Sequence, residues 1–255
     1  MSRVIAFAYG ILSYLIFLGT FLYAIGFVGG FVVPKSVDSG AATSFWSALA
    51  IDVGLLGLFG LQHSVMARPA FKKWWTRIVP KPVERSTYVL CASLALILLF
   101  WLWQPLPGTV WTVEGDVGRT LLWGLFGLGW ALVLGATFMI SHAHLFGLAQ
   151  VAEHLRGRNV SPPRFQTPGL YRHVRHPIML GFLIAFWAAP TMSTGHLLFA
   201  VVTTGYILVA LQLEERDLAN AFGEQYERYR ERVPMFIPRL SRTAGRAEPG
   251  NEDDL

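Results

Sequence analysis

Long apolar stretches separated by polar connections dominate the pattern along this chain. Six of them stand out: Val4–Val33, Phe45–Met66, Thr87–Trp103, Thr120–Ile140, Ile178–Ala189 and His196–Leu213. A membrane-spanning helix needs roughly 17 to 25 apolar residues, and every stretch except Ile178–Ala189 comes close to that length. Val4–Val33 is too long for the apolar core of a cleavable signal peptide, so we expect it to remain as the first span. The pattern predicts an all-α, polytopic membrane helical bundle with five to six transmembrane helices.

The short stretch Ile178–Ala189 lies between two prolines, and we interpret it as one arm of a helical hairpin. Pro177 and Pro190 bound it, and Thr191–Gly195 offers the turn to the last apolar stretch. Proline lacks the amide hydrogen that a helix interior needs, so it commonly marks a helix end. With this hairpin counted, we favour six crossings over five.

The basic residues alternate between the connections and so predict an orientation. Most of the 21 Lys and Arg residues fall in Ala67–Ser86, in Ser141–Pro177 and after Leu213, whereas the other connections between spans hold only Lys35 and Arg119. Lys and Arg in short loops mark the cytoplasmic side. Six crossings then place both termini in the cytoplasm, and we assign the net charge of +5 to a membrane face rather than to a nucleic-acid site.

Composition narrows the class of protein further. Hydrophobic residues make up 53% of the chain and charged residues 15%, against about 25% charged in soluble domains. This composition excludes a disordered chain and argues against an ordinary soluble domain. The single cysteine, Cys91, excludes an intramolecular disulfide, and we assign its thiol to packing.

Four segments bring ionisable residues to the predicted cytoplasmic end of the spans. The residues are His63 in the second span, His142 and His144 after the fourth span, Arg172, His173, Arg175 and His176 before the hairpin, and Glu214 and Glu215 at the end of the last span. Each alone is commonly an interfacial anchor, but ionisable groups collected at one membrane level are candidates for function. His196 lies at the opposite face and is excluded, and we expect Asp52 to bond one helix to another.

A metal site is a weaker interpretation of the same histidines. His142 and His144, taken with His173 and His176, match no helical i, i+4 pair and have no supporting cysteine pair. We therefore predict no metal ligands. A non-catalytic membrane factor that holds haem or copper through His142, His144 and His176 remains an alternative.

After Leu213 the pattern stays helical but becomes polar. One face carries Glu215, Leu218, Phe222, Tyr226 and Tyr229, which recur at steps of three and four. Glu224 and Arg228 form an i, i+4 pair on another face. Gly223 weakens a helix by about 1 kcal/mol, so we expect a bend or break there. From periodicity alone, an amphipathic helix on the bilayer surface is an equal alternative.

Two motifs in the last third of the chain resemble those of the isoprenylcysteine carboxyl methyltransferase superfamily. The first is Arg175-His176-Pro177-Ile178-Met179-Leu180-Gly181, similar to the signature Arg-His-Pro-x-x-x-Gly. The second comprises Glu214-Glu215, Leu218, Phe222-Gly223, Tyr226, Tyr229 and Val233, before Pro234 and Pro238. The layout of the whole chain, including Phe31–Ser36, is most similar to bacterial members that methylate a small thiol.

This resemblance implies a methyltransferase that binds S-adenosyl-L-methionine on the cytoplasmic side, between the loop before the hairpin and the helix after it. The cofactor-binding residues that it implies are Arg175, His176, Gly181, Glu214, Glu215, Phe222, Tyr226 and Tyr229. A glutamate suits the amino group of the cofactor, Arg175 or His176 suits its carboxylate, and aromatic faces attract a sulfonium cation.

The resemblance also implies methanethiol as the methyl acceptor and dimethyl sulfide as the product, formed by in-line displacement in a membrane-embedded pocket. A thiol reacts as the thiolate, so a histidine is expected to take or share its proton. In order of preference the candidates are His142, His144 and His63. Hydrogen sulfide, a phospholipid amine or a prenylcysteine carboxylate are alternative acceptors, and a non-catalytic factor for nitrogen-oxide reduction is the alternative to an enzyme.

We therefore expect one methyltransferase domain over 1–255 in the bacterial inner membrane, with its site in the cytoplasm. Residues 1–140 would form four spans, 141–240 the cofactor-binding loop, hairpin and C-terminal helix, and 241–255 a polar tail. The expected partners are a small volatile thiol and membrane lipid, with no nucleic acid and no obligate protein partner.

Overall fold

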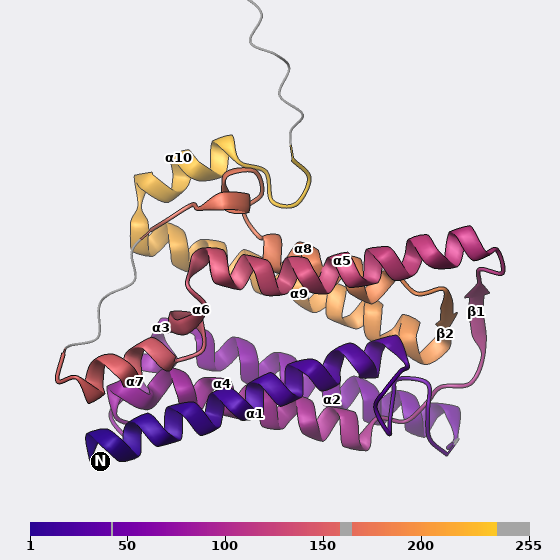
Figure 1. The fold of residues 1–255 in the computed structure, drawn as a ribbon, viewed down its shortest axis with the longest axis horizontal. Coiled ribbons are helices and arrows are strands. Elements are labelled where there is room, and N and C mark those ends of the chain that lie inside the picture. The colour runs from indigo at the N-terminus through magenta and orange to yellow at the C-terminus, as the bar shows by residue number, and fades with distance from the viewer. Residues whose placement is uncertain (42, 159–164, 239–255) are drawn as a thin grey trace, which may run out of the picture.

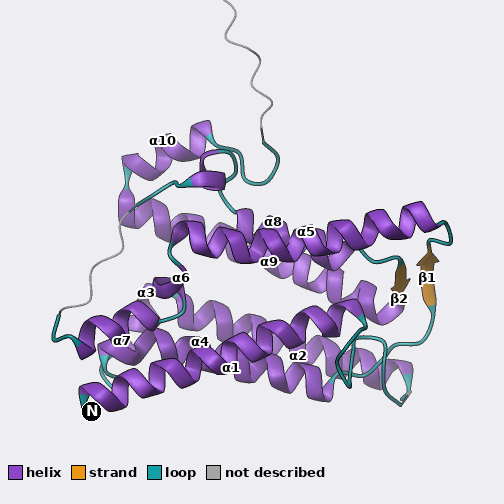
Figure 2. Ribbon diagram, in the orientation of Figure 1, coloured by secondary structure: helices purple, strands orange, loops and turns teal. Residues whose placement is uncertain are grey.

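The computed structural model describes residues 1–41, 43–158 and 165–238, whose regular secondary structure is almost entirely helical (Figure 2). Within these residues, five helices are long and apolar enough to cross a membrane: α1 (Arg3–Gly29), α2 (Phe45–Ala67), α4 (Lys81–Leu102), α5 (Asp116–Ile140) and α9 (Thr194–Phe222). The predicted all-α membrane bundle is confirmed. The chain is an integral membrane protein. The predicted polar tail, 241–255, lies outside the described residues.

The helices form two layers, as Figure 1 shows. Helix α4 packs against α1 and α2 in one layer, and α5 packs along α8 (Pro177–Trp187) in the other, beside α9. Helix α8 has 11 residues, so at 1.5 Å per residue it reaches about half the hydrocarbon thickness of a bilayer. Helices α8 and α9 are the two arms of the predicted hairpin.

The tip of the hairpin differs from the prediction. Residues Thr191–Ser193 form strand β2, which pairs antiparallel with β1 (Thr109–Thr112) in the connection between α4 and α5. Thr194 and Gly195 belong to α9, because Ser193 caps that helix by accepting a hydrogen bond from the amide of His196 at 2.9 Å. The predicted turn over Thr191–Gly195 is therefore wrong, and the all-α bundle carries one short β ladder. Strand β1 contains Thr, Val and Trp, which favour strands.

Several helix ends also differ from their predicted positions. Helix α1 ends at Gly29 and not Val33, because Gly30 takes a left-handed conformation (φ 72°) that ends the helix. Helix α4 begins at Lys81, where the following proline is tolerated in the first turn. The base-rich connections contain α3 (Pro69–Trp75), α6 (His142–Leu145), α7 (Leu148–Leu155) and the 3₁₀ helix η1 (Gly169–Arg172).

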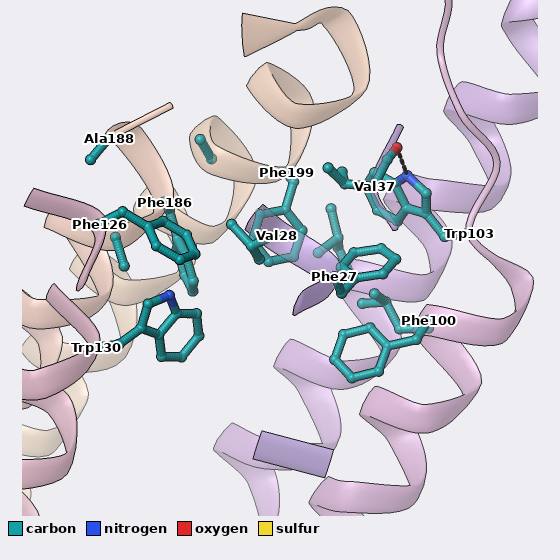
Figure 3. Packing of buried hydrophobic residues seen from close by; sticks show 14 of the residues in the cluster. Phe27, Val28, Val37, Phe100, Trp103, Phe126, Trp130, Phe186, Ala188 and Phe199 are labelled. Atoms are coloured by element: carbon teal, nitrogen blue, oxygen red, sulfur yellow. Dashed lines mark hydrogen bonds between the residues drawn. The ribbon is translucent and has the colours of Figure 1, made fainter. Parts of the chain in front are cut away.

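Aromatic side chains fill the space between the layers (Figure 3). The cluster draws side chains from α1, α4, α5, α8 and α9 and from Trp103, which follows α4. Its aromatic members include Phe27, Phe100, Trp103, Phe126, Trp130, Phe186 and Phe199. The indole of Trp103 donates to the carbonyl of Val37 at 3.0 Å. Asp52 in α2 is fully buried and accepts from the amide of Gln104 at 2.9 Å. It therefore bonds α2 to the connection after α4 rather than to a second helix, which was the expectation.

Two glycines allow α5 and α8 to approach closely. A Cβ added to Gly181 would lie 2.7 Å from the carbonyl oxygen of Gly129, and one added to Gly129 would lie 2.7 Å from the oxygen of Gly181. Such contacts between backbones are typical of small residues in membrane helices. Gly181 therefore faces α5, and we leave it out of the residues proposed to bind the cofactor.

Candidate functional site

A charged cluster joins the residues before α8 to the last turns of α9. The guanidinium of Arg175 donates through Nε to Glu215 Oε1 at 2.8 Å, and His176 Nε2 lies 3.0 Å from the same oxygen. The three side chains are only 8 to 10% exposed. A carboxylate oxygen beside a guanidinium can only accept, so Nε2 of His176 carries a hydrogen.

The same arginine holds the chain after α10 (Glu224–Arg232). Its Nη1 donates to the carbonyl oxygens of Arg230 and Val233 at 3.0 and 2.6 Å, and its backbone amide donates to Pro234 at 2.9 Å. The two sequence motifs thus meet at Arg175, and residues 230–234 fold back over the start of α8.

The cluster keeps hydrogen-bonding capacity on both charged side chains. Among the residues that the structure describes, the hydrogen bonds of Glu215 both use Oε1, and those of the Arg175 side chain use Nε and Nη1. Glu215 Oε2 and Arg175 Nη2 therefore remain for further partners. A group with one negative and one positive end can bind here without breaking the ion pair.

Four aromatic rings gather beside this cluster. The ring of Phe165 lies 5.4 Å from Phe222, 6.0 Å from Tyr226 and 5.4 Å from Tyr229, centroid to centroid. Gly223 (φ 54°) separates α9 from α10 at the predicted break and lets these rings share one side. Sequence reasoning missed Phe165, since only its aromatic character within a polar connection distinguishes it.

The two tyrosines of α10 differ in their hydroxyl groups. Tyr229 donates to the carbonyl oxygen of Tyr171 at 2.6 Å. Tyr226 is 1% exposed, and its hydroxyl has no hydrogen-bond partner among the described residues. Burial raises the pKa of both phenols, that of Tyr229 to about 12, so both are donors at neutral pH. A buried hydroxyl without a partner costs stability, so the Tyr226 hydroxyl is available for a further hydrogen bond.

Glu214 and Glu215, which the sequence left as alternatives, occupy different surroundings. Glu215 is buried in the charged cluster, whereas Glu214 is exposed. The Glu214 carboxylate is within electrostatic range of tyrosines from four elements, Tyr88, Tyr171, Tyr206 and Tyr226. Glu215 is therefore the glutamate that the structure places with Arg175 and His176.

The preferred histidine, His142, is held on both ring nitrogens. Thr137 Oγ1 lies 2.8 Å from Nδ1, Tyr14 Oη lies 2.9 Å from Nε2, and Phe138 stacks on the ring at 4.3 Å. Burial lowers the pKa of His142 below its usual value. The imidazole is therefore neutral at neutral pH and can accept a proton.

The other two histidines have separate partners. His144 is exposed, and its Nδ1 lies 2.7 Å from Ser141 Oγ at the start of α6. His63 stacks on Phe59 and lies 2.9 Å from the hydroxyl of Tyr88 through Nε2. Within the described residues the structure brings these histidines into no shared cluster, and no group of three or more His, Cys, Asp or Glu could hold a metal ion.

A cavity of about 280 Å³ lies at the other end of the bundle. Asp38, Arg119, Trp123 and His196 are among the residues that line it, next to the hairpin tip. His196 is bound there by the carbonyl of Phe186 at 2.9 Å. Because Arg175 and Glu215 lie at the opposite end of α8 and α9, this cavity is not part of the charged cluster.

Comparison with known proteins identifies the family. The chain is 59% identical over 237 residues to methanethiol S-methyltransferase 1 of Bradyrhizobium diazoefficiens, covering 92% of this chain and 83% of the relative. It is 57% identical over 238 residues to the methanethiol S-methyltransferase of Mycobacterium tuberculosis, covering 93% and 98%. The chain belongs to the methanethiol S-methyltransferase family. The relationship predicted from the Arg175 and Glu215 motifs is thereby confirmed.

More distant similarity extends beyond the methanethiol S-methyltransferases. Nurim of Sus scrofa is 35% identical over 179 residues, which cover 67% of this chain and 68% of that protein. No family model and no solved structure matches the chain.

Proposed function

We propose that this protein transfers a methyl group from S-adenosyl-L-methionine to methanethiol and releases dimethyl sulfide. The observation that carries the proposal is the buried Arg175–His176–Glu215 cluster, which joins the two motifs beside four aromatic rings. Relatives with 57 to 59% identity are named for this reaction.

The residues of the cluster fit the amino-acid end of this cofactor. A zwitterion needs an acceptor for its ammonium and a donor for its carboxylate, and charge-assisted hydrogen bonds are the strongest available. Glu215 Oε2 and Arg175 Nη2 supply one of each, because their other atoms are already held by the protein. His176 keeps Glu215 in position rather than binding the ligand directly.

The aromatic cluster fits the remaining part. Phe165, Phe222, Tyr226 and Tyr229 present faces that would stack on an adenine or attract a sulfonium by about 0.5 to 2 kcal/mol. The hydroxyl of Tyr226, which lacks a partner among the described residues, would donate to a cofactor nitrogen or oxygen. The glycine-rich motif with which many soluble enzymes bind nucleotide cofactors is not needed, because these side chains would supply the contacts with the nucleoside.

The reaction requires that the thiol lose its proton in a pocket from which water is excluded. When bound, S-adenosyl-L-methionine supplies an electrophilic methyl group on a sulfonium sulfur. His142, neutral and half-buried between Tyr14 and Phe138, would receive the thiol proton. Apolar side chains of the two layers would exclude water and so strengthen the attraction between thiolate and sulfonium. Dimethyl sulfide is apolar and can leave through lipid.

We place this chemistry at the cytoplasmic face of the bacterial inner membrane. The N-terminus, α7 and α10 lie at one end of the bundle (Figure 1), and the segments rich in Lys and Arg adjoin that end, as the charge rule for cytoplasmic loops requires. This orientation would put the charged cluster on the cytoplasmic side, where the methyl donor is made.

The experiment is a headspace assay with isotope label. Purified protein in vesicles would receive methanethiol and S-adenosyl-L-methionine that carries a deuterated methyl group. The proposal predicts dimethyl sulfide with one labelled methyl, formed in equal amount to S-adenosylhomocysteine. Protein that binds S-adenosylhomocysteine but yields no labelled dimethyl sulfide would contradict the choice of acceptor.

A further inference from the structure

Thr137 determines which nitrogen of His142 carries the hydrogen. The hydroxyl of Thr137 donates to the carbonyl oxygen of Leu134 at 2.7 Å, and a hydroxyl has only one hydrogen to donate. Toward Nδ1 of His142, 2.8 Å away, Thr137 must therefore accept. The neutral ring then carries its hydrogen on Nδ1 and its lone pair on Nε2.

That lone pair is occupied by Tyr14. The Tyr14 hydroxyl lies 2.9 Å from Nε2, and because Nε2 has no hydrogen, Tyr14 donates. A thiol cannot reach the basic nitrogen without displacing this hydroxyl. One face of the ring is covered by Phe138, which stacks on it at 4.3 Å, and Phe146 lies tilted against the ring at 4.7 Å.

Among the residues that the structure describes, the contacts of the His142 ring come from uncharged side chains. These are Thr137 and Phe138 from α5, Tyr14 from α1 and Phe146 after α6. Of these only Tyr14 titrates, and burial alone lowers the pKa of the ring. Any proton that arrives at Nε2 must come through the tyrosine hydroxyl.

We propose that Tyr14 is the group that contacts the thiol and passes its proton to His142. The thiol S–H bond breaks as its proton moves to Tyr14 Oη, while the hydrogen of Tyr14 moves to Nε2. The products are a thiolate, a neutral tyrosine and an imidazolium whose Nδ1–H still donates to Thr137. The thiolate electron pair would then form the new S–C bond to the transferred methyl group. The bond between that methyl and the sulfonium sulfur would break, its electron pair staying on the sulfur of S-adenosylhomocysteine. The imidazolium later loses its extra proton to water. This step rests on the proposed thiol methylation.

Helix α1 offers a matched control for this tyrosine. The hydroxyl of Tyr9 donates to Thr87 Oγ1 at 3.0 Å, and Thr87 in turn donates to the carbonyl of Val83 at 2.9 Å. Tyr9→Phe thus removes the same atom and the same kind of hydrogen bond from the same helix, without touching His142.

The test compares wild type, Tyr14→Phe and Tyr9→Phe in vesicles with methanethiol between about pH 6 and about pH 8. We expect Tyr14→Phe to form dimethyl sulfide about 100-fold more slowly at neutral pH, the usual effect of losing acid–base assistance. Its rate should then rise about tenfold per pH unit, because it depends on thiolate already present in solution. Wild type and Tyr9→Phe should depend on pH much less steeply.

Affinity for S-adenosylhomocysteine separates this role from a structural one. Tyr14→Phe should bind it as wild type does, which also shows that the variant is folded. An active wild type together with a Tyr14→Phe variant of normal rate and pH profile would overturn the proposal for Tyr14 alone. A slower Tyr14→Phe variant with the wild-type pH profile would assign a packing role and overturn it too. A wild type that makes no dimethyl sulfide would instead overturn the proposed function.

Discussion

Arg175 and Glu215 are 40 positions apart in the chain, yet Nε of one lies 2.8 Å from Oε1 of the other. The bond joins the loop before α8 to α9, and the same guanidinium holds the carbonyls of Arg230 and Val233 after α10. Removing either partner leaves a charge in a largely buried place, which is costly. This pair therefore determines the shape of the site as well as its charge.

Glu215→Gln should weaken binding of S-adenosylhomocysteine by about 30-fold or more, since loss of one partner of a buried charge pair costs about 2 to 5 kcal/mol. The matched control is Glu224→Gln, because the Glu224–Arg228 pair at 2.6 Å is exposed to solvent. Isothermal titration in detergent measures both. Equal affinities of the two variants would contradict the role of Glu215.

Arg175→Lys should not replace the wild-type arginine, because one ammonium group cannot donate hydrogen bonds in the directions of a guanidinium group. We expect weaker binding and faster proteolysis at residues 230–235, which lose their carbonyl contacts. Limited proteolysis followed by mass spectrometry locates the cuts. Arg228→Lys, on the exposed face of α10, is the control and should leave the cleavage pattern unchanged.

Gly181→Ala should lower stability by about 1 to 3 kcal/mol, because the added methyl meets backbone atoms of α5. Gly127→Ala, where an added Cβ meets nothing within 4 Å, should be neutral or slightly stabilising. Thermal unfolding in detergent compares them. If Gly181→Ala instead reduced cofactor affinity and left the unfolding temperature unchanged, Gly181 would belong to the binding site after all.

Tyr226→Phe and Tyr229→Phe should have opposite effects. The first removes a hydroxyl without a partner among the described residues, so we expect unchanged or higher stability and about tenfold weaker S-adenosylhomocysteine binding, the equivalent of one hydrogen bond. The second removes the bond to Tyr171 and should cost about 1 kcal/mol of stability. Thermal unfolding and isothermal titration of both variants measure these effects. Equal affinity of Tyr226→Phe and wild type for S-adenosylhomocysteine would exclude a hydrogen bond from the Tyr226 hydroxyl to the cofactor.

The rate of methyl transfer should fall only at a pH below the pKa of a free imidazole. Burial lowers the pKa of His142, so the ring stays neutral, and able to accept a proton, to a lower pH than a free imidazole with a pKa of about 6.5. A turnover profile at saturating cofactor measures the acid limb. A midpoint above that of free imidazole would show that another group titrates.

The sequence predicted that Arg175 and the Glu214–Glu215 pair lie at one membrane level, because both fall at the same end of their spans. It did not predict which of the two glutamates contacts Arg175. Tyr226 and Tyr229 were found through their helical spacing, and the break at Gly223 through its low helix propensity. Gly181 was assigned to cofactor binding because a motif shows that a glycine is needed but does not show whether a ligand or a neighbouring helix requires the space.

Other parts of the site depend on the path of the chain and not on local patterns. Phe165 precedes η1 in an irregular connection, so no periodicity relates its ring to α10. Tyr14 lies within a long apolar span, where a tyrosine has no distinctive neighbours in sequence, and only the packing of α1 on α6 and α7 shows its partner. The ladder between β1 and β2 is too short for alternation to be detected.

The most direct test of the account is a structure of the protein with S-adenosylhomocysteine bound. We predict density for its amino-acid end between Arg175 and Glu215, and for its nucleoside end against Phe165, Tyr226 and Tyr229. Density in the cavity beside Asp38 and Arg119, with the Arg175–Glu215 cluster unchanged and empty, would contradict it.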